Sequence, residues 1–187
     1  LFVEEIIQLI NLYNDSANLV AVTVSPPPEI VARQQVYKET VSYRIGNKVI
    51  RVRYQDEELK WAIHPPLAHL QIRDQNSADQ IDIFSEGDLL LFAHNGKIKD
   101  CFRKEDISYF TGCVKQLMFS IVYDRGYNDW MMALHASCVA QNGDSVVFSA
   151  ASGSGKSTLS ALLKAHGYTF LSDDFIVAGF DRKVYAF

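Results

Sequence analysis

A short run of small residues that ends in a lysine is the strongest chemical signal in this sequence. Residues 150–157 read Ala-Ala-Ser-Gly-Ser-Gly-Lys-Ser, the pattern of a phosphate-binding loop with Ala150 in place of the first glycine. Glycines allow backbone amides to surround phosphate oxygens, because no side chain stands in the way. Lys156 would neutralise the β- and γ-phosphates of ATP, and the Ser157 hydroxyl would bind Mg²⁺. The residues predicted to bind the nucleotide are Ala151, Ser152, Gly153, Ser154, Gly155, Lys156, Ser157 and Thr158.

The segments on either side of this loop favour the same interpretation. Ser145–Ser149 is apolar and predicts a strand, while Lys156–His166 predicts an amphipathic helix that ends at Gly167. The residues expected on the buried face of this helix are Leu159, Leu162 and Leu163. Tyr168–Ser172 predicts a further strand, which completes a βαβ unit. A flexible Gly/Ser linker, the alternative, explains neither the lysine nor the flanking elements.

An acidic pair, Asp173 and Asp174, follows the second strand of this unit. The strands of a βαβ unit are parallel, so their carboxyl ends lie at the same edge of the sheet. The pair should therefore emerge beside the phosphate loop. One carboxylate could hold Mg²⁺, and the other could accept a proton from an attacking hydroxyl. Taken without the loop, two such aspartates would more simply form a turn and cap a helix.

His135 is the third candidate for chemistry. It lies near the start of a predicted strand, Leu134–Ala140, which should form a hairpin with the strand before the loop. From this position alone, a packed histidine or a turn residue is the ordinary interpretation, and a functional role is the alternative.

Three segments together resemble the catalytic domain of the HPr kinase/phosphorylase family. They are Leu134–Ser137, Ala151–Thr158 and Leu171–Asp174. The chain is even more similar to HPr-kinase-related enzymes, including kinases found with ribosomal peptide biosynthesis. His135 lies 21 residues before Lys156, and Asp174 lies 18 residues after it, which agrees with the family spacing. The resemblance implies that His135 and Lys156 are active-site residues, that Asp174 accepts the proton, and that Ser157 binds Mg²⁺. With Asp174 as the base, Asp173 is the carboxylate of the acidic pair expected to help hold Mg²⁺.

The sequence departs from the family pattern in three places. Ala150 replaces the leading glycine of the loop, and Thr158 stands where authentic HPr kinases commonly have glutamate. The downstream acidic Mg²⁺ ligand of the family and its later signature would fall beyond Phe187. Thr158 and the unfamiliar N-terminal region favour an acceptor other than HPr itself.

The first two thirds of the chain predict a β-rich unit that ends in a helix. Alternating runs on either side of Gly46-Asn47 and of Asn95-Gly96 indicate two β-hairpins. Glu105–Tyr123 repeats apolar residues with the 3.6-residue period of a helix. The strands expected are 35–45, 48–54, 81–84, 89–94 and 97–102, with a short helix over 1–14, a strand over 19–24, and a final hairpin of 175–180 with 183–187.

Composition excludes several classes of function. The 187 residues contain 18 Lys+Arg and 22 Asp+Glu, so no basic field favours nucleic acid as a partner. The apolar runs are too short for a transmembrane helix, so no membrane partner is expected. Three cysteines match neither a zinc pattern nor a disulfide framework, which is typical of reduced thiols in the cytoplasm.

These observations predict two domains. An α+β accessory domain over residues 1–128, for substrate recognition, precedes the start of an α/β P-loop nucleotide-binding domain over 129–187, similar to the C-terminal domain of HPr kinase. The expected activity is transfer of the ATP γ-phosphoryl group to a hydroxyl, a serine above all, of a peptide, protein or small molecule. An ATPase subunit of a transporter or motor and a non-catalytic nucleotide-binding module are the alternatives, and a homo-oligomer stays open. Trp130–Phe187 is short for a complete domain of this kind, so we expect a fragment.

Overall fold

A computed structural model describes residues 24–27, 30, 32, 35–73, 77–151 and 153–186. The chain is a mixed α/β protein with three sheets and few helices, consistent with the expected α+β class. The helix predicted for residues 1–14 lies outside the described residues. So does the strand predicted for 19–24, except Val24, whose amide donates to the Cys101 carbonyl at 3.0 Å without forming a strand.

The largest sheet has six strands in the order β3-β1-β2-β4-β5-β6. Its strands are β1 (Glu39–Ile45), β2 (Lys48–Tyr54), β3 (Gln71–Ile72), β4 (Asp79–Glu86), β5 (Leu89–His94) and β6 (Lys97–Arg103). The β1–β2 and β5–β6 hairpins confirm the two predictions made from Gly46-Asn47 and Asn95-Gly96. The first strand begins at Glu39, later than the predicted residue 35. β2 and β4 pair in parallel, because α2 (Glu57–Ile63) and the 3-10 helix η2 (Pro65–Leu70) lie between them in the chain.

Helix α2 was not among the predicted elements. Asp56 caps its N-terminus, because the Asp56 carboxylate accepts a hydrogen bond from the Leu59 amide at 2.9 Å. Leu59 and Ile63 are its buried residues, and they pack into the core of the large sheet. Two buried positions in one short helix are too few for a helical period to stand out in the sequence.

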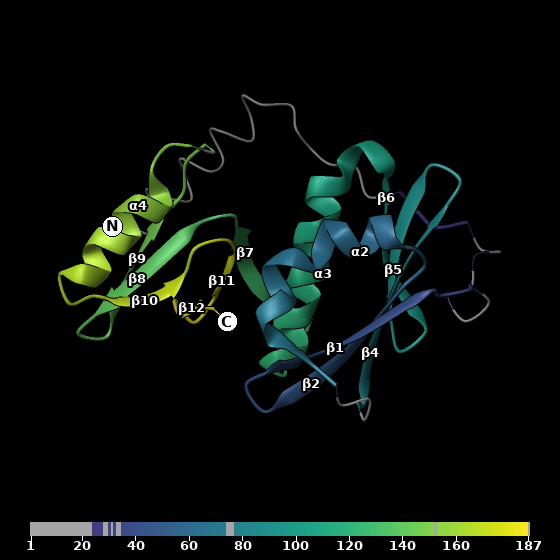
Figure 1. Cartoon of the computed structure of the whole chain (residues 1–187), viewed down its shortest axis with the longest axis horizontal. Coiled ribbons are helices and arrows are strands. Elements are labelled where there is room, and N and C mark those ends of the chain that lie inside the picture. Colours follow the sequence, from purple (N-terminus) through teal and green to yellow (C-terminus); the bar gives the residue numbers. More distant parts are fainter. Residues whose placement is uncertain are drawn as a thin grey trace.

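Helix α3 (Ile107–Val122), which follows the 3-10 turn η3 (Lys104–Asp106), confirms the predicted helix and stands between the large sheet and the two small ones (Figure 1). Phe110, Val114 and Leu117 pack into the core of the large sheet. Phe119 instead packs with Trp130 and with residues further along the chain. The helix therefore belongs to the hydrophobic cores on both sides of it.

Two three-stranded sheets follow α3. One has the order β12-β11-β7, from β7 (Trp130–Leu134), β11 (Ile176–Gly179) and β12 (Val184–Tyr185). The other has the order β10-β8-β9, from β8 (Ser137–Gln141), β9 (Asp144–Phe148) and β10 (Thr169–Ser172). The β11–β12 pairing confirms the last predicted hairpin.

The single strand predicted over Leu134–Ala140 is wrong, because the chain changes sheets within it. β7 pairs with β11, whereas β8 pairs with β9 and β10. His135 and Ala136 lie in the break between the two strands and belong to neither ladder. His135 is therefore held at the junction of two sheets, not at the start of one strand.

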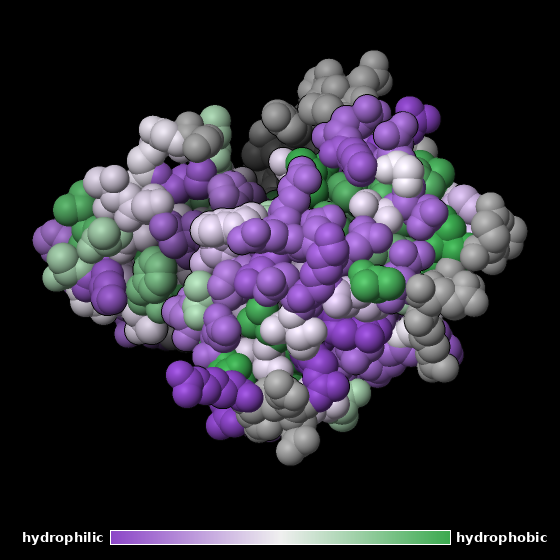
Figure 2. Space-filling model, turned by 45° about the vertical axis from the view of Figure 1, so that its right-hand side comes forward, coloured by the Kyte–Doolittle hydropathy of each residue, from purple (hydrophilic) through white to green (hydrophobic). Residues whose placement is uncertain are grey.

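Helix α4 (Lys156–Ala165) confirms the predicted position but not the predicted face. Leu159 and Leu162 are 42% and 56% exposed, Leu163 is half-buried, and Ser160 is the buried position. The helix contacts β8 and β10, and a sheet of three strands covers only a narrow stripe of it. Hydrophobic side chains consequently reach the surface at the end of the molecule where α4 lies (Figure 2). Gly167 follows the helix with a φ of 93°, as predicted for its C-terminal stop.

Candidate functional site

The order of strands around β8 brings the three predicted segments to one edge of a sheet. β9 and β10 each pair with β8 in the antiparallel direction, so they run parallel to each other with β8 between them. The loop after β9 and the acidic pair after β10 therefore leave the sheet on the same side. His135, which precedes β8, lies on that side too. The common edge confirms the prediction, whereas the position of β8 between the two strands was not foreseen.

The loop before α4 bends through two glycines with left-handed backbone angles. Gly153 has a φ of 78° and Gly155, the N-cap of α4, has a φ of 89°. Residues with a side chain rarely adopt left-handed backbone angles, which accounts for glycine at both positions. The Lys156 ammonium turns back onto the loop and donates to the carbonyls of Ala150 and Ala151 at 2.7 and 3.2 Å.

The other predicted loop residues lie around this bend. Ser154 donates its amide to the Ala151 carbonyl at 3.3 Å, and Ser157 and Thr158 are exposed in the first turn of α4. Ser152 lies outside the described residues. The described part of the loop therefore carries one ammonium, the three exposed hydroxyls of Ser154, Ser157 and Thr158, and the amino-terminal end of a helix.

Two basic side chains contact Asp174, one at each carboxylate oxygen. His135 Nδ1 lies 3.1 Å from Oδ1 of Asp174, and Lys115 Nζ makes a short contact with Oδ2. Both oxygens are engaged, so the plane of the carboxylate is fixed. The Asp174 side chain nevertheless remains 43% exposed, which leaves it accessible to a reactant.

Lys115 was not among the predicted site residues. It comes from the middle of α3, 59 residues before Asp174 in the chain, and its side chain is 13% exposed. Its ammonium also lies 5.6 Å from the centre of the Phe175 ring. The signal that could have found it is chemical, since Lys115 is the one charged residue within α3.

Asp173 points to a different partner from its neighbour. Its carboxylate accepts a short hydrogen bond from the hydroxyl of Ser137, the buried first residue of β8. The two members of the acidic pair are thus separated: Asp174 meets His135 and Lys115, whereas Asp173 is tied to the central strand. A division of roles between them is chemically reasonable.

A cavity of about 560 Å³ opens beside Asp174, between α3 and the end of β7. Its lining residues are Ser108, Tyr109, Thr111, Gly112, Cys113, Lys115, Gln116, Ala133, His135, Asp174 and Phe175. Burial raises the pKa of the Cys113 thiol to about 11, so this cysteine is protonated at neutral pH. Cys113 is therefore a packing residue of the wall and not a nucleophile.

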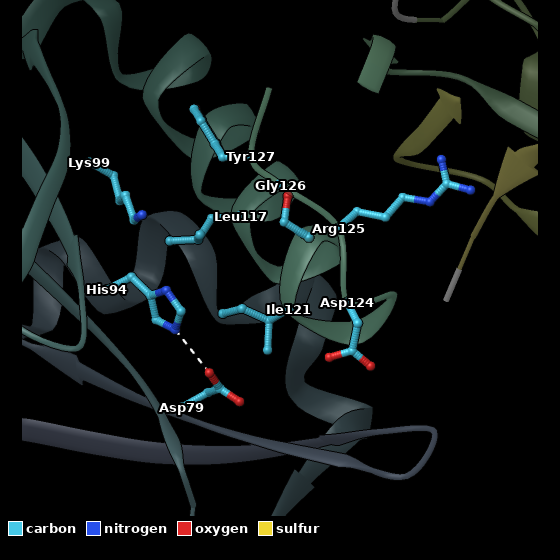
Figure 3. A pocket seen from close by; sticks show the side chains of 10 residues that line it. Asp79, His94, Lys99, Leu117, Ile121, Asp124, Arg125, Gly126 and Tyr127 are labelled. Carbon is cyan, nitrogen blue, oxygen red and sulfur yellow. Dashed lines mark hydrogen bonds and ion pairs between the residues drawn. The ribbon is translucent and has the colours of Figure 1, made fainter. Parts of the chain in front are cut away.

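A second cavity, of about 340 Å³, lies near the other end of α3 (Figure 3). His94 and Asp79 face each other across part of its wall, with Nε2 and Oδ1 2.9 Å apart. The Asp124 carboxylate in its wall is already paired with Lys48 at 2.6 Å. None of the predicted site residues lines this cavity.

Within the described ranges, no three His, Cys, Asp or Glu side chains gather in a geometry that could hold a metal ion. No helix in the same ranges is long and apolar enough to cross a membrane. No family model, curated protein or solved structure matches the chain.

Proposed function

We propose that this chain is the nucleotide-binding part of an ATP-dependent kinase that phosphorylates a hydroxyl group. The observation that carries the proposal is the meeting of His135 with Asp174 at the edge where the Lys156 loop leaves the same sheet. A phosphate donor, a general base and a cationic partner are what phosphoryl transfer to a hydroxyl requires. The resemblance to HPr-kinase-related enzymes supports the same assignment, with residues 129–187 as the start of a P-loop domain.

The donor chemistry of the loop suits a nucleoside triphosphate. The left-handed glycines 153 and 155 leave open space beside the backbone, since nothing lies within 4 Å of a side-chain carbon placed there. The amide groups at the start of α4 and the Lys156 ammonium then provide hydrogen bonds and positive charge for phosphate oxygens. When bound, Mg²⁺ supplies further positive charge to the phosphates, and Ser157 and Asp173 are the residues that would hold it.

The proposed reaction makes one bond to phosphorus and breaks another. Asp174 accepts the proton of the acceptor hydroxyl, whose oxygen forms a bond to the γ-phosphorus. The bond from that phosphorus to the oxygen between the β- and γ-phosphates breaks, and its electron pair leaves with ADP. Lys156 stabilises the charge on the transferred group. His135 holds the Asp174 carboxylate in place at 3.1 Å and remains next to the reacting oxygen.

The test is phosphoryl transfer from γ-labelled ATP to serine-containing acceptors, with Asp174→Asn as the decisive variant. Loss of the base should lower kcat by about 100-fold or more, while ATP affinity stays unchanged. Asp144→Asn is the matched control, because Asp144 is exposed at the opposite end of the same sheet, and it should retain full activity.

The other outcomes separate the alternatives. An Asp174→Asn variant that still transfers phosphate would overturn the role of Asp174 as base. ATP binding without any turnover by the wild-type protein would identify a nucleotide-binding module, and release of phosphate to water alone, insensitive to acceptors, would identify an ATPase.

A further inference from the structure

We propose that the cavity between α3 and Asp174 binds the acceptor, and that Lys115 positions the Asp174 carboxylate for it. This inference rests on the proposed kinase function and specifies where its second substrate enters. The ligand chemistry is a primary hydroxyl, carried either by a small polar molecule or by a serine side chain.

The position of the cavity relative to the loop supports this assignment. Asp174 and His135 form part of its wall, whereas no described residue of the predicted phosphate loop lines it. A hydroxyl in the cavity would therefore reach the Asp174 carboxylate from the side of α3, and ATP would approach from the side of α4. Separate approaches to one base are what an in-line displacement needs, because attacking and leaving oxygens lie on opposite sides of phosphorus.

The size and the polarity of the cavity set the class of acceptor. A volume of about 560 Å³ lies within the range of about 300–1,000 Å³ typical of small-molecule sites. The wall on α3 presents Ser108, Thr111 and Gln116 together with the exposed ring of Tyr109. A mixture of polar groups and one aromatic ring suits a small polar compound or one side chain of a peptide. The cavity is too small to accommodate the surface of a folded protein.

Lys115 is the residue of α3 that connects this wall to the chemistry. Its ammonium contacts Oδ2 of Asp174, opposite the oxygen that His135 contacts, and its low exposure limits competition from water. Removal of the ammonium leaves the carboxylate held on one side only, so it can turn away from the acceptor. Lys115 does not need to touch phosphate for this role, which makes it a positioning residue.

The first experiment fills the cavity with Thr111→Trp, one helical turn before Lys115. The acceptors are N-acetylserinamide and a serine-containing pentapeptide, each measured with γ-labelled ATP. The KM for the acceptor should rise by about 10-fold or more, while the affinity for ATP changes by less than about twofold. Lys104→Trp is the control, because Lys104 is exposed just before α3 and lies outside the cavity. Whichever acceptor the wild-type protein uses identifies the source of the hydroxyl.

The second experiment tests Lys115 with Lys115→Met and Lys115→Arg. The methionine variant should lower kcat by about 10-fold with little change in KM for ATP, and arginine should restore most of the loss. A residue needed only for folding would change the melting temperature without a selective loss of kcat. Thermal melting of both variants therefore accompanies the kinetics.

The results of these experiments distinguish failure of the acceptor site from failure of the proposed kinase function. A wild-type protein that binds ATP but phosphorylates neither acceptor overturns the kinase proposal, and the acceptor site with it. A wild-type protein that is active, together with a Thr111→Trp variant of unchanged acceptor KM, overturns the acceptor site alone. An unchanged kcat in Lys115→Met overturns the positioning role.

Discussion

Gly155 and Gly46 have similar backbone conformations in different parts of the chain. Their φ angles are 89° and 59°, and nothing lies within 4 Å of a side-chain carbon placed on either. The difference is one of position, because Gly46 is in the β1–β2 turn and Gly155 starts α4. A substitution at each should therefore have the same backbone cost but different functional consequences.

We predict that Gly155→Ala and Gly46→Ala each lower the free energy of unfolding by about 1–2 kcal/mol, because alanine is strained in the left-handed region. Only Gly155→Ala should also weaken ATP binding, since its strain changes the direction of the loop amides. Chemical denaturation and ATP titration of both variants check this prediction. Equal loss of ATP affinity in the two variants would show that the effect is one of stability and not of the loop.

The sequence was sufficient to predict several residues of the site but not their contacts. His135 and Asp174 were both expected there, whereas the 3.1 Å contact between His135 Nδ1 and Asp174 Oδ1 was not predicted. Lys115 could not be predicted in this way, because its contact with Asp174 depends on how α3 packs against a segment 59 residues later. No local pattern encodes a packing arrangement over that distance.

Two buried serines, one on α3 and one on α4, differ in whether their hydroxyl groups form hydrogen bonds. The Ser120 hydroxyl, on α3, donates to the Gln116 carbonyl at 3.0 Å and accepts from the Trp130 indole at 2.8 Å. The Ser160 hydroxyl, on α4, is buried with no hydrogen-bond partner in the described structure. A buried polar group without a partner costs free energy, whereas a bonded one does not.

Opposite effects should therefore follow from the same substitution. Ser160→Ala should stabilise the protein by about 1 kcal/mol, because it removes an unpaired hydroxyl. Ser120→Ala should destabilise it by about 1–3 kcal/mol, because the Trp130 indole loses its acceptor. Urea denaturation of the two variants measures both changes, and destabilisation by Ser160→Ala would contradict the environment described for α4.

The sequence predicted correctly those helices and strands whose turns or periodicity lie within a short stretch of the chain. The Gly46-Asn47 and Asn95-Gly96 turns and the long period of α3 are encoded within a few residues. The two wrong predictions, the strand through His135 and the buried face of α4, concerned how an element packs against its neighbours. The break at His135 reflects a change of partner strands, and the exposed leucines of α4 reflect the width of the sheet beneath them. Neither can be deduced from the element alone.

Helix α3 contributes residues to two hydrophobic cores, that of the large sheet and that around Trp130. Phe119 is 1% exposed and packs with Trp130 and Val177, while residues on the opposite side of the helix pack into the large sheet. The boundary at 128/129 remains a prediction of the sequence. A helix shared between two cores should make their unfolding cooperative, whether or not a domain boundary lies nearby.

We expect a single calorimetric transition for the wild-type chain. Phe119→Ala should remove about 3–5 kcal/mol and separate a transition of the C-terminal sheets at lower temperature from that of the large sheet. Phe84→Ala is the control, because Phe84 is equally buried but packs in a cluster on the large sheet that includes neither α3 nor the C-terminal sheets. It should lower stability without splitting the transition. Two transitions in the wild-type chain would show that α3 does not couple the cores.

The three-stranded sheet beside α4 has one more consequence, for behaviour in solution. Among the described strands, β9 and β10 are the two edges of their sheet, and each pairs on one side only. Phe170, on the edge strand β10, is 40% exposed, and Leu162, on the neighbouring helix α4, is 56% exposed. Open edges beside apolar side chains favour self-association as concentration rises. The average molecular mass measured by sedimentation or light scattering should therefore increase with protein concentration. The net charge of −4 is small, so charge repulsion opposes this association only weakly.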